Sequence, residues 1–460
     1  MNMYNLLKQR EAIGKPIRVG IIGAGRYSAQ FIAQLPFIPG IKLVSVAELD
    51  IGKAREVCTK AGWAEESISL ANTANEINDG ARSGKVVLTE DSVQLIGAEL
   101  DIVIEVTGVA EAGAYHSWKA LEEGKHVITV TVEADHLVGN TLKQLADKKG
   151  LVYSLGYGDQ PACLCEQIDW VRTFGFEVVC AGDYKLHKVG QEYSTPDNVW
   201  EHYGYSEEQV KAGHFNSKLY TSFVDGTKTA IEMCSVANAC NLVPQKRGLT
   251  YPVVSYDDSP NMLKPISEGG ILEHSGTVEV PSVRTRDGKV LIQSPHWGPL
   301  WGVYTAFKGR SEYVRHFMTY FNNQNRILTD SSGAYSMLFR PIHILGLELG
   351  FSVAQVGLFN TPTGTPVSLV GDVVAVAKKD LNAGEVLDGP GGYTVFGRLV
   401  PTEESLAKKY LPVELSEKAK LTRNVDKDSF ITYDDVTMDE SGFLFQLRRK
   451  TEKEYSPAAH

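Results

Sequence analysis

The sequence predicts an α/β protein with three regions: a parallel-sheet region, a mixed α+β region and a small β-rich region. Three observations lead to this fold class. Up to residue 157, short apolar runs alternate with helix-prone segments, which is typical of strands joined through helices into a parallel sheet. From there to residue 345, helical segments and strands mix with long loops rich in glycine and proline. The rest of the chain reads mainly as short strands and turns.

The strands expected in the first region are short runs rich in valine, isoleucine and leucine. Helices are expected between them, for example over 112–123 and 137–148, and the polar stretch 52–83 is expected to be helical with two breaks. This alternation predicts a doubly wound parallel sheet. The expected strands cover residues 17–22, 41–46, 86–89, 101–106, 126–131 and 151–156.

A glycine turn follows the first of these strands. Gly23 and Gly25 fill the first two positions of a G-x-G-x-x-G pattern, and the small residue Ser28 takes the third. The turn precedes a helix, and the acidic residue Glu48 follows the end of the next strand. Glycines let the backbone approach a pyrophosphate, which the N–H groups of the following helix can bind. The pattern therefore predicts a Rossmann-type dinucleotide-binding domain over residues 1–157.

Residues around the glycine turn bear on the choice between NAD and NADP. Glu48 would accept hydrogen bonds from ribose hydroxyls and repel a 2′-phosphate, which favours NAD. Arg26, which with Tyr27 directly follows the glycines, would attract that phosphate and favour NADP. Each charge would otherwise be a solvated surface group. The sequence therefore predicts NAD(P) as the cofactor and leaves the choice between the two forms open.

Further cofactor contacts are expected where other strands end. Thr107 and Gly108 close the strand DIVIEV, and Glu133 follows the strand HVITVT. Ligands of open parallel sheets lie beyond the carboxyl ends of the strands. These three residues are therefore expected to line the nicotinamide half of the site. The alternative for Glu133 is a helix-start residue, because acidic side chains are favoured there.

Composition and charge argue against several classes of partner. The 460 residues carry a formal net charge of −10, and an acidic protein is a poor partner for nucleic acid or anionic lipid. No apolar run reaches the roughly 20 residues needed to cross a bilayer, and the N-terminus lacks the apolar core of a secretory signal. We therefore expect a cytoplasmic protein with a small-molecule substrate, no nucleic-acid or membrane partner, and reduced cysteines.

The segment SFVDGTKTAIEMCSVANA, beginning at Ser222, is the candidate catalytic helix. On one continuous helix Asp225, Lys228 and Glu232 fall within an arc of about 60°. Two carboxylates and a lysine on a largely apolar helix are costly unless the charges are paired or used. A lysine with a shifted pKa can polarise a carbonyl or move a hydroxyl proton. The alternative is an exposed, salt-bridged face of little energetic weight.

Several longer motifs resemble a known group of oxidoreductases. DIVIEVTG, VEADH, GDQPA, SFVDGTK, FRPIHILGLE and DVVAVAKKDLNAGEVLDGPGGYTVFG resemble the homoserine-dehydrogenase-like enzymes that carry a C-terminal SAF domain. The best-known activity in that group is that of the 1-deoxy-D-xylulose 5-phosphate reductoisomerase-like enzymes. The resemblance implies that Asp225 and Lys228 form the D-x-x-K pair of homoserine dehydrogenase. It also implies that Asp159 and Gln160, in GDQPA, stand at the mouth between cofactor and substrate.

The change of pattern after the first region and the linker around Pro362 and Pro366, together with the resemblance, suggest how the rest of the chain is divided. Residues 158–345 would form the substrate and catalytic domain, and 346–363 a helix and linker that packs on the first domain. The strongly apolar segment 340–359 is expected to be helical. Residues 364–460 would form the SAF-like domain, acting as a lid or an oligomer contact. A homo-oligomer, dimeric or tetrameric, is implied by the family alone.

A basic cluster formed by Lys185, His187 and Lys188 is the candidate substrate-binding element. It could hold a phosphate or a carboxylate, although each residue could equally serve at the surface. The neighbouring Asp183 and Tyr184 depart from the small turn, rich in glycine and lysine, that the resemblance leads us to expect. These two residues could equally signal a different substrate.

Together these observations predict an NAD(P)-dependent oxidoreductase acting on a small phosphorylated or carboxylated hydroxy-ketone or polyol. Lys228 would polarise or protonate the reacting oxygen, and Asp225 would orient it. Glu232 or Asp159 would relay protons or help to hold a divalent cation, Mg²⁺ or Mn²⁺, in a reductoisomerase reaction. Oxidation of a hydroxy acid or an amino alcohol is the main competing reaction. A non-catalytic dinucleotide-binding regulator, or a cofactor-assisted epimerase or lyase, would also be consistent with these residues.

Overall fold

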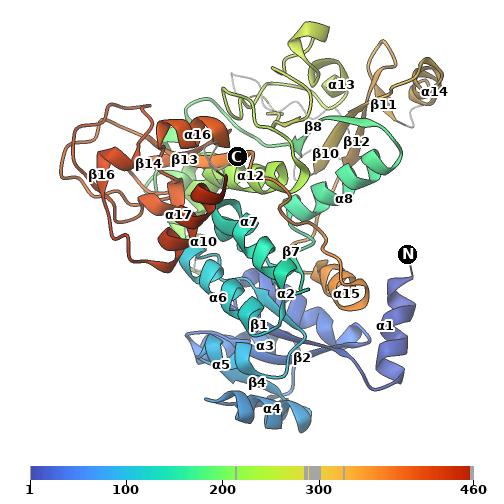
Figure 1. Ribbon diagram of the computed structural model, residues 1–460, viewed down its shortest axis with the longest axis vertical. Helices are drawn as coiled ribbons and strands as arrows, with labels where there is room; N and C mark the ends of the chain where they lie inside the picture. Colours follow the sequence, from blue (N-terminus) through green and yellow to red (C-terminus); the bar gives the residue numbers. More distant parts are fainter. Residues whose placement is uncertain (1, 213–214, 284–288, 290–301, 325–326, 456–460) are drawn as a thin grey trace. The chain divides into compact units, whose positions relative to one another are not determined.

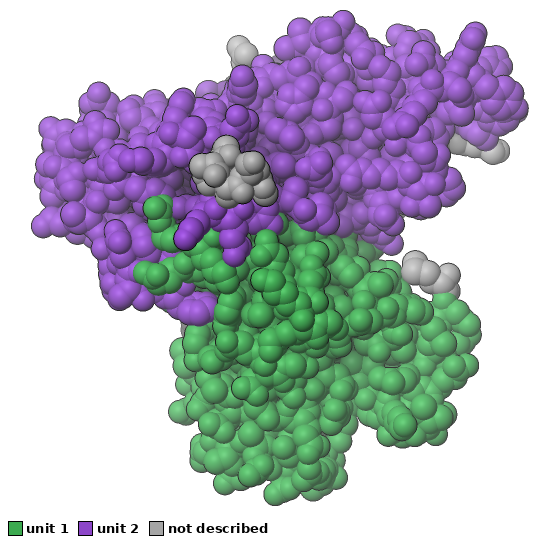
Figure 2. All heavy atoms as spheres, in the orientation of Figure 1, with its two compact units in different colours: residues 1–163, 343–366, 446–451 green, residues 164–342, 367–445, 452–460 purple. Residues whose placement is uncertain are grey.

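The computed structural model describes residues 2–212, 215–283, 289, 302–324 and 327–455 (Figure 1). The chain forms two compact units (Figure 2). Each unit draws on more than one stretch of the chain, and the bounds predicted above for four consecutive segments stay a prediction. Unit 1 comprises residues 1–163, 343–366 and 446–451, and unit 2 comprises residues 164–342, 367–445 and 452–460.

Unit 1 is built on a seven-stranded sheet in the order β3-β4-β2-β1-β5-β6-β7, in which all neighbours are parallel. This confirms the predicted α/β fold with a Rossmann-type sheet. The strand order reverses at β1, and ligands of such sheets bind beyond the carboxyl ends of the strands at this point. The strands are β1 (Ile17–Ile22), β2 (Ile41–Ala47), β3 (Ile68–Leu70), β4 (Val86–Thr89), β5 (Ile102–Glu105), β6 (His126–Thr129) and β7 (Tyr153–Leu155).

The strand β3 is a correction to the prediction, since it lies inside the polar stretch 52–83 that was expected to be helical. Its three residues pair in parallel with β4, and only Ile68 is buried, so the sequence shows no apolar run there. The helices of unit 1 are α1 (Met3–Ala12), α2 (Arg26–Gln34), α3 (Ile51–Lys60), α4 (Ala74–Arg82), α5 (Ser92–Gly97), α6 (Ala110–Glu122), α7 (Val132–Lys148) and α15 (Leu349–Phe359).

Helix α15 packs into the core of unit 1, although about 175 residues separate it from the end of α8 (Gln160–Thr173), which starts at the end of the first segment. Leu349 and Val353 are buried in the same apolar cluster as Ile17. The helix begins at Leu349, so the expected helical segment 340–359 is wrong in its first half. Pro341 disfavours helix in the residue before it, and Gly346 has a φ of 75°, which breaks a helix.

Unit 2 holds a five-stranded mixed sheet in the order β11-β12-β10-β8-β9 and two small antiparallel sheets, β13-β14 and β15-β16. In the mixed sheet β10 is antiparallel to both β8 and β12, whereas β9 is parallel to β8. Its strands are β8 (Glu177–Asp183), β9 (Thr277–Val278), β10 (Val303–Lys308), β11 (Leu328–Thr329), β12 (Tyr335–Arg340), β13 (Gly371–Ala377), β14 (Val395–Pro401), β15 (Lys420–Leu421) and β16 (Val436–Thr437).

The remaining helices lie in unit 2, apart from portions of α8 and α17 that belong to unit 1, and α12 packs against β13 and β14. They are α8, α9 (Val199–Tyr203), α10 (Glu207–Ala212), α11 (Ser217–Val224), α12 (Thr227–Cys240), α13 (Ser259–Met262), α14 (Glu312–Asn322), α16 (Thr402–Lys408) and α17 (Phe443–Tyr455).

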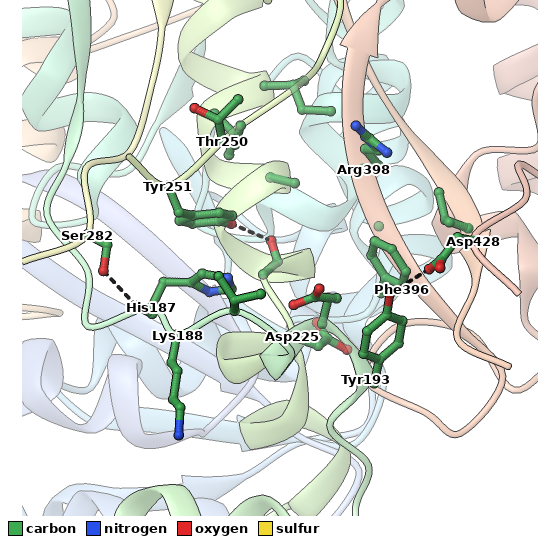
Figure 3. A pocket seen from close by; sticks show the side chains of 18 of the residues that line it. His187, Lys188, Tyr193, Asp225, Thr250, Tyr251, Ser282, Phe396, Arg398 and Asp428 are labelled. Carbon is green, nitrogen blue, oxygen red and sulfur yellow. Dashed lines mark hydrogen bonds between the residues drawn. The ribbon is translucent and has the colours of Figure 1, made fainter. Parts of the chain in front are cut away.

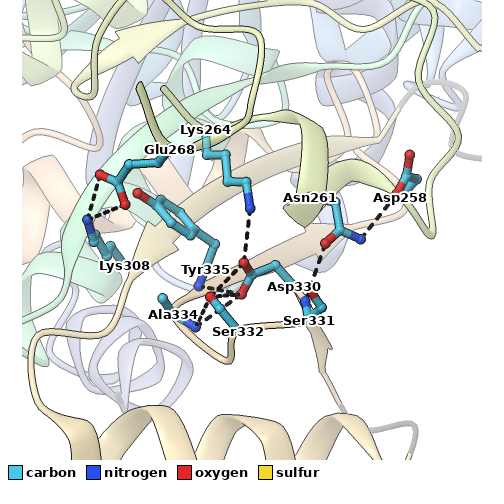
Figure 4. Close-up of polar contacts among 10 residues, drawn as sticks. All are labelled: Asp258, Asn261, Lys264, Glu268, Lys308, Asp330, Ser331, Ser332, Ala334 and Tyr335. Atoms are coloured by element: carbon cyan, nitrogen blue, oxygen red, sulfur yellow. Dashed lines mark hydrogen bonds and ion pairs between the residues drawn. The ribbon is translucent and has the colours of Figure 1, made fainter. Parts of the chain in front are cut away.

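A polar network closes the turn between β11 and β12 (Figure 4). The Asp330 carboxylate accepts hydrogen bonds from the backbone N–H groups of Ala334 and Tyr335 at 3.0 and 3.1 Å, and from Lys264 Nζ at 3.1 Å. Burial alone would raise the pKa of Asp330, but these hydrogen bonds bring it below its usual range. None of these residues lines the pocket of unit 2, so we assign the network a structural role in the turn between β11 and β12.

Candidate functional site

The glycine turn of unit 1 has the geometry that a dinucleotide requires. Gly23 has a φ of 106°, and a Cβ at this position would lie 2.9 Å from the carbonyl oxygen of Val106, so only glycine fits. Gly25 caps the N-terminus of α2, and a Cβ there would project into open space. With no side chain at the cap, the first turn of α2 can present its N–H groups to an anion. The residues present therefore fit a bound pyrophosphate.

Glu48 lies beside this turn, at the carboxyl end of β2. Its Oε2 accepts a hydrogen bond of 2.7 Å from the backbone N–H of Ala24 and lies 3.2 Å from Lys53 Nζ. The carboxylate is therefore fixed next to the position expected for the adenine-side ribose. Its role in choosing between NAD and NADP stays a prediction, as do the cofactor contacts of Arg26 and Tyr27, the first two residues of α2.

The end of β5 contains a buried acid that the sequence analysis missed. Glu105 is wholly buried, and its Oε1 accepts a hydrogen bond of 2.6 Å from the hydroxyl of Thr107. The ring of His116 approaches the same oxygen at 3.4 Å. Gly108 donates its backbone N–H to the hydroxyl of Thr131 at 3.0 Å. Thr107 and Gly108 are thus held in place at the carboxyl edge of the sheet.

Tyr27 and Asp159 share the environment at the end of the first segment. The Tyr27 hydroxyl donates to the carbonyl of Tyr157 at 3.1 Å, and burial, followed by the charge of Asp159, raises the pKa of Tyr27 well above its usual value. Asp159 and Gln160 are themselves buried where α8 begins.

Glu133 is the second residue of α7 and is half-buried, which fits the helix-start alternative as well as a cofactor contact.

Unit 2 contains a pocket of about 370 Å³, here called the unit 2 pocket. His187 and Tyr251 stand on one side, Tyr193 and Phe396 on the other, and Asp225 lies between them (Figure 3). Among the residues predicted for substrate and catalysis, Asp225, His187 and Lys188 line this pocket. Lys228 and Glu232 lie on α12, and Lys185 lies just after β8. None of these three residues lines the unit 2 pocket.

The predicted catalytic helix is two helices, which corrects the expected shared face. α11 ends at Val224, Asp225 follows it, and α12 begins at Thr227. The break occurs at Gly226, whose φ of 85° is left-handed and where a Cβ would lie 2.7 Å from the Tyr251 hydroxyl. Asp225 is therefore at the junction, outside α12. Lys228 and Glu232 are four residues apart on α12 and do share a face.

Asp225 is paired with a lysine that the sequence analysis did not consider. Its Oδ2 lies 2.8 Å from Lys378 Nζ, and its Oδ1 accepts the backbone N–H of Thr227 at 2.9 Å. Burial raises the pKa of Asp225, and the charge of Lys378 works in the opposite direction. Lys378 follows the strand β13, far away in the sequence, and only the doubled lysine at the end of DVVAVAKK marks it.

The predicted basic cluster is divided by the fold. Lys185 Nζ lies 2.7 Å from the buried carboxylate of Asp183, which offsets its charge locally. Burial lowers the pKa of His187 to about 4, so the ring is neutral at pH 7. Lys188 is exposed and lines the pocket, and its contact with an anionic substrate group stays a prediction. A second cation, Arg398 on β14, lines the same pocket and was missed.

Tyr251 is a strained residue of the pocket wall. Its φ of 47° is left-handed, which bulky residues rarely adopt and which occurs preferentially at functional sites. Behind it Glu279 is wholly buried and accepts hydrogen bonds from Gln245 Nε2 and Thr250 Oγ1 at 2.7 and 2.8 Å. Backbone strain has no local sequence signal, so the sequence could not predict that Tyr251 forms part of the pocket wall.

The described residues offer no cluster suited to a metal ion. No group of three or more His, Cys, Asp or Glu side chains converges among them in a way that could hold one, so these residues do not fit the expected divalent cation. In the same part of the chain, no helix is both long and apolar enough to cross a membrane.

Two family models match the chain. Residues 158–349 match the catalytic domain of oxidoreductase DRL, and residues 55–154 match the NAD binding domain of homoserine dehydrogenase. The first includes Asp225, His187, Lys188 and Tyr251, and the second includes Thr107 and Gly108. A search of curated proteins gives no match.

Solved structures give distant similarities. Scyllo-inositol dehydrogenase from Lactobacillus casei is 13% identical with a TM-score of 0.39, over 76% of this chain and 92% of that one. 1-Deoxy-D-xylulose 5-phosphate reductoisomerase from Zymomonas mobilis is 11% identical with a TM-score of 0.33, over 48% and 57%. Biliverdin reductase from Synechocystis sp. PCC 6803 is 20% identical with a TM-score of 0.26, over 38% of this chain and 49%, about half, of that reductase. In the order of the chain, a segment similar to the NAD binding domain of homoserine dehydrogenase is therefore followed by one similar to the catalytic domain of oxidoreductase DRL.

Proposed function

We propose that the protein is an NAD(P)-dependent oxidoreductase that acts on a small phosphorylated or carboxylated hydroxy-ketone or polyol, with a reaction like that of 1-deoxy-D-xylulose 5-phosphate reductoisomerase. One observation carries the proposal. A buried, charge-paired carboxylate, that of Asp225, forms part of a pocket wall within the segment that matches an oxidoreductase catalytic domain. Buried ionisable groups of this kind are concentrated at catalytic sites.

The cofactor would be held by unit 1. When bound, NAD(P) supplies or accepts the hydride. Gly23 and Gly25 would let the backbone meet the pyrophosphate, and the first turn of α2 would donate N–H groups to it. Glu48 would bind the ribose hydroxyls, and Thr107, fixed by Glu105, would face the nicotinamide. Arg26, Tyr27, Gly108 and Glu133 are proposed as further cofactor contacts.

The unit 2 pocket has the chemistry for a small polar substrate with one anionic end. Asp225 can accept hydrogen bonds from substrate hydroxyls and, with Thr250 and Tyr251, surrounds the position of a polyol chain. Arg398 and Lys188 supply positive charge for a phosphate or carboxylate. His187 is neutral at pH 7, so it would act there as a hydrogen-bonding group. Pockets of this size hold ligands of this class.

Lys228 is proposed as the group that polarises or protonates the reacting oxygen. It lies in the first turn of α12, two residues after Gly226, which lines the pocket, and it is half-buried. Glu232, one turn later on the same face, would relay the proton, with Asp159 as the alternative relay. Asp225, which the structure pairs with Lys378, is proposed to contact the substrate and not to orient Lys228.

The test is nicotinamide absorbance with 1-deoxy-D-xylulose 5-phosphate and either NADPH or NADH, with Mg²⁺ or Mn²⁺ added. We expect the wild type to oxidise NADPH or NADH, and the variants Lys228→Met and Asp225→Asn to lose at least about a hundredfold in kcat while keeping cofactor affinity. Lys246→Met, at an exposed position of the same unit, is the matched control. Lack of oxidation by a protein shown to bind the cofactor would contradict the reductoisomerase reaction.

Oxidation of a hydroxy acid or amino alcohol is the second candidate, favoured by the homoserine dehydrogenase match of residues 55–154. Reduction of NAD⁺ or NADP⁺ by L-homoserine or a related hydroxy acid, without turnover of the phosphorylated ketose, would favour it. Cofactor binding with no turnover of either class would favour a regulatory dinucleotide-binding protein. We also propose a homo-oligomer, on the resemblance alone, and no nucleic-acid partner, on the net charge of −10.

A further inference from the structure

The strongest unassigned feature of unit 2 is the ion pair between Lys378 and Asp225. Their side chains are only 2% and 0% exposed, and the ammonium nitrogen lies 2.8 Å from the carboxylate. The same ammonium donates to the carbonyl oxygens of Ser194 at 2.6 Å and Gly392 at 2.7 Å. The buried ammonium therefore has two carbonyl acceptors and one ion-pair partner.

The three partners of Lys378 belong to three different parts of the pocket wall. Ser194 ends the stretch that carries His187 and Tyr193. Gly392 precedes β14, which carries Phe396 and Arg398. Asp225 lies at the junction between α11 and α12 and lines the pocket itself. One buried cation therefore joins all three, and it comes from the C-terminal segment of the chain.

The pair also fixes which way the Asp225 carboxylate faces. One oxygen is held by Lys378 and the other by the backbone N–H of Thr227 at 2.9 Å, so the carboxyl plane cannot turn freely. A carboxylate this deeply buried is expensive unless it has a compensating charge. The other titratable or charged groups that line the pocket with it are His187, Lys188, Glu192, Tyr193, Tyr251, Arg398 and Asp428.

We propose that Lys378 is the positioning residue of the unit 2 pocket: it keeps Asp225 ionised and oriented toward the substrate, so that the C-terminal segment completes the site. The proposal rests on the proposed function only where it names a substrate as the occupant. The charge and the orientation of Asp225 are properties of the protein without substrate, and they can be tested without any turnover.

The first test compares Lys378→Met with the double variant Asp225→Asn/Lys378→Met by thermal unfolding of the full chain between about pH 4 and pH 8. Without Lys378 the carboxyl of Asp225 is buried with no counter-charge, and its ionisation opposes folding. Near pH 4, where Asp225 is protonated in Lys378→Met, the two variants should therefore have similar Tm. The double variant should become increasingly more stable as pH rises. A Tm difference that does not change with pH would overturn the proposal.

Lys379→Met is the control for this comparison. Lys379 is the next residue in the chain, but its side chain is 53% exposed and pairs with Glu385 at 2.9 Å on the surface. The Tm of Lys379→Met should equal that of the wild type at every pH. If Lys378→Met does not fold, Asp225→Asn is compared with the wild type instead. The wild type should then be the more stable of the two at neutral pH, because Asp225→Asn leaves the buried Lys378 without its counter-charge, and an Asp225→Asn variant at least as stable as the wild type would overturn the proposal.

The second test uses turnover. Lys378→Met should lower kcat at least about tenfold and shift the acid limb of the pH–rate profile to higher pH, while the affinity for NADPH stays unchanged. An unchanged kcat and pH profile would overturn the positioning role, whatever the Tm. Should the wild type turn over none of the substrates, the proposed function fails, and the Tm comparison alone still decides whether Lys378 maintains the charge of Asp225.

Discussion

The imidazole of His187 stacks on the ring of Tyr251, with ring centroids 4.0 Å apart and planes inclined by 19°. The contact joins a residue of the predicted basic cluster to the strained residue of the pocket wall. It also explains the low pKa of His187, since burial against an aromatic ring disfavours the imidazolium. The protonation of this ring should therefore be visible in the stability of the folded chain.

Stability should fall in acid because of His187. Its pKa is about 4 in the folded chain against 6.5 for the free side chain, so the unfolded chain binds the extra proton between these values. The contribution is fully present above pH 6.5 and is lost as pH falls through the folded pKa, by up to about 3 kcal/mol. Urea unfolding at a series of pH values measures it. His187→Phe should keep the stacking and remove this part of the pH dependence, and an unchanged slope would contradict the assignment.

The two glycines of the dinucleotide turn should respond differently to alanine. Gly23→Ala places a Cβ against Val106 at a left-handed φ, so we expect a loss of at least about 1–3 kcal/mol of stability together with cofactor binding. Gly25→Ala meets open space and should leave the free energy of unfolding within about 1 kcal/mol of the wild type while weakening NADH binding. Fluorescence titration with NADH and chemical unfolding separate the two effects. Equal losses in both variants would contradict the proposed pyrophosphate position.

Glu105 should affect the affinity for the cofactor, because it holds the hydroxyl of Thr107 in place. Glu105→Ala leaves the Thr107 hydroxyl without its 2.6 Å acceptor and should weaken NADH binding about tenfold or more. Glu99→Ala is the control, because Glu99 sits on the surface of the same unit with its side chain 53% exposed. Isothermal titration with NADH measures both variants. Wild-type affinity in Glu105→Ala would show that Thr107 does not contact the nicotinamide.

Glu48 should set the balance between the two cofactor forms. Glu48→Gln removes the negative charge but keeps an acceptor for the 2.7 Å hydrogen bond from Ala24. The ratio of NADH to NADPH affinity should therefore move toward NADPH, by about tenfold, because repulsion of the 2′-phosphate is lost. Parallel titrations with the two cofactors measure this ratio. A ratio that stays constant would place Glu48 outside the ribose site.

The parts of the fold that the sequence could predict are those determined by local patterns. Strand β1 and the glycine turn after it are visible as an apolar run and a spacing of glycines, and the structure confirms the parallel sheet they predict. The break at Gly226 was missed because the left-handed φ of 85° and the close approach of Tyr251 exist only in the folded chain. Lys378 was missed for the same reason: the pairing of charges across distant segments is a property of the folded chain, which periodicity does not encode.

The order in which this chain leaves the ribosome has a consequence for how unit 1 assembles. The sheet and its flanking helices are complete by residue 163, yet α15 and residues 446–451 belong to the same unit. Thr451, in α17, shares a hydrogen bond of 2.7 Å with Thr141, and Arg448 is wholly buried beside the carbonyl of Leu137. During synthesis, the apolar flank of unit 1 that α15 covers must therefore stay open until that helix emerges. We expect that a chain ending before α15 would be retained by chaperones or aggregate, because this flank would stay exposed.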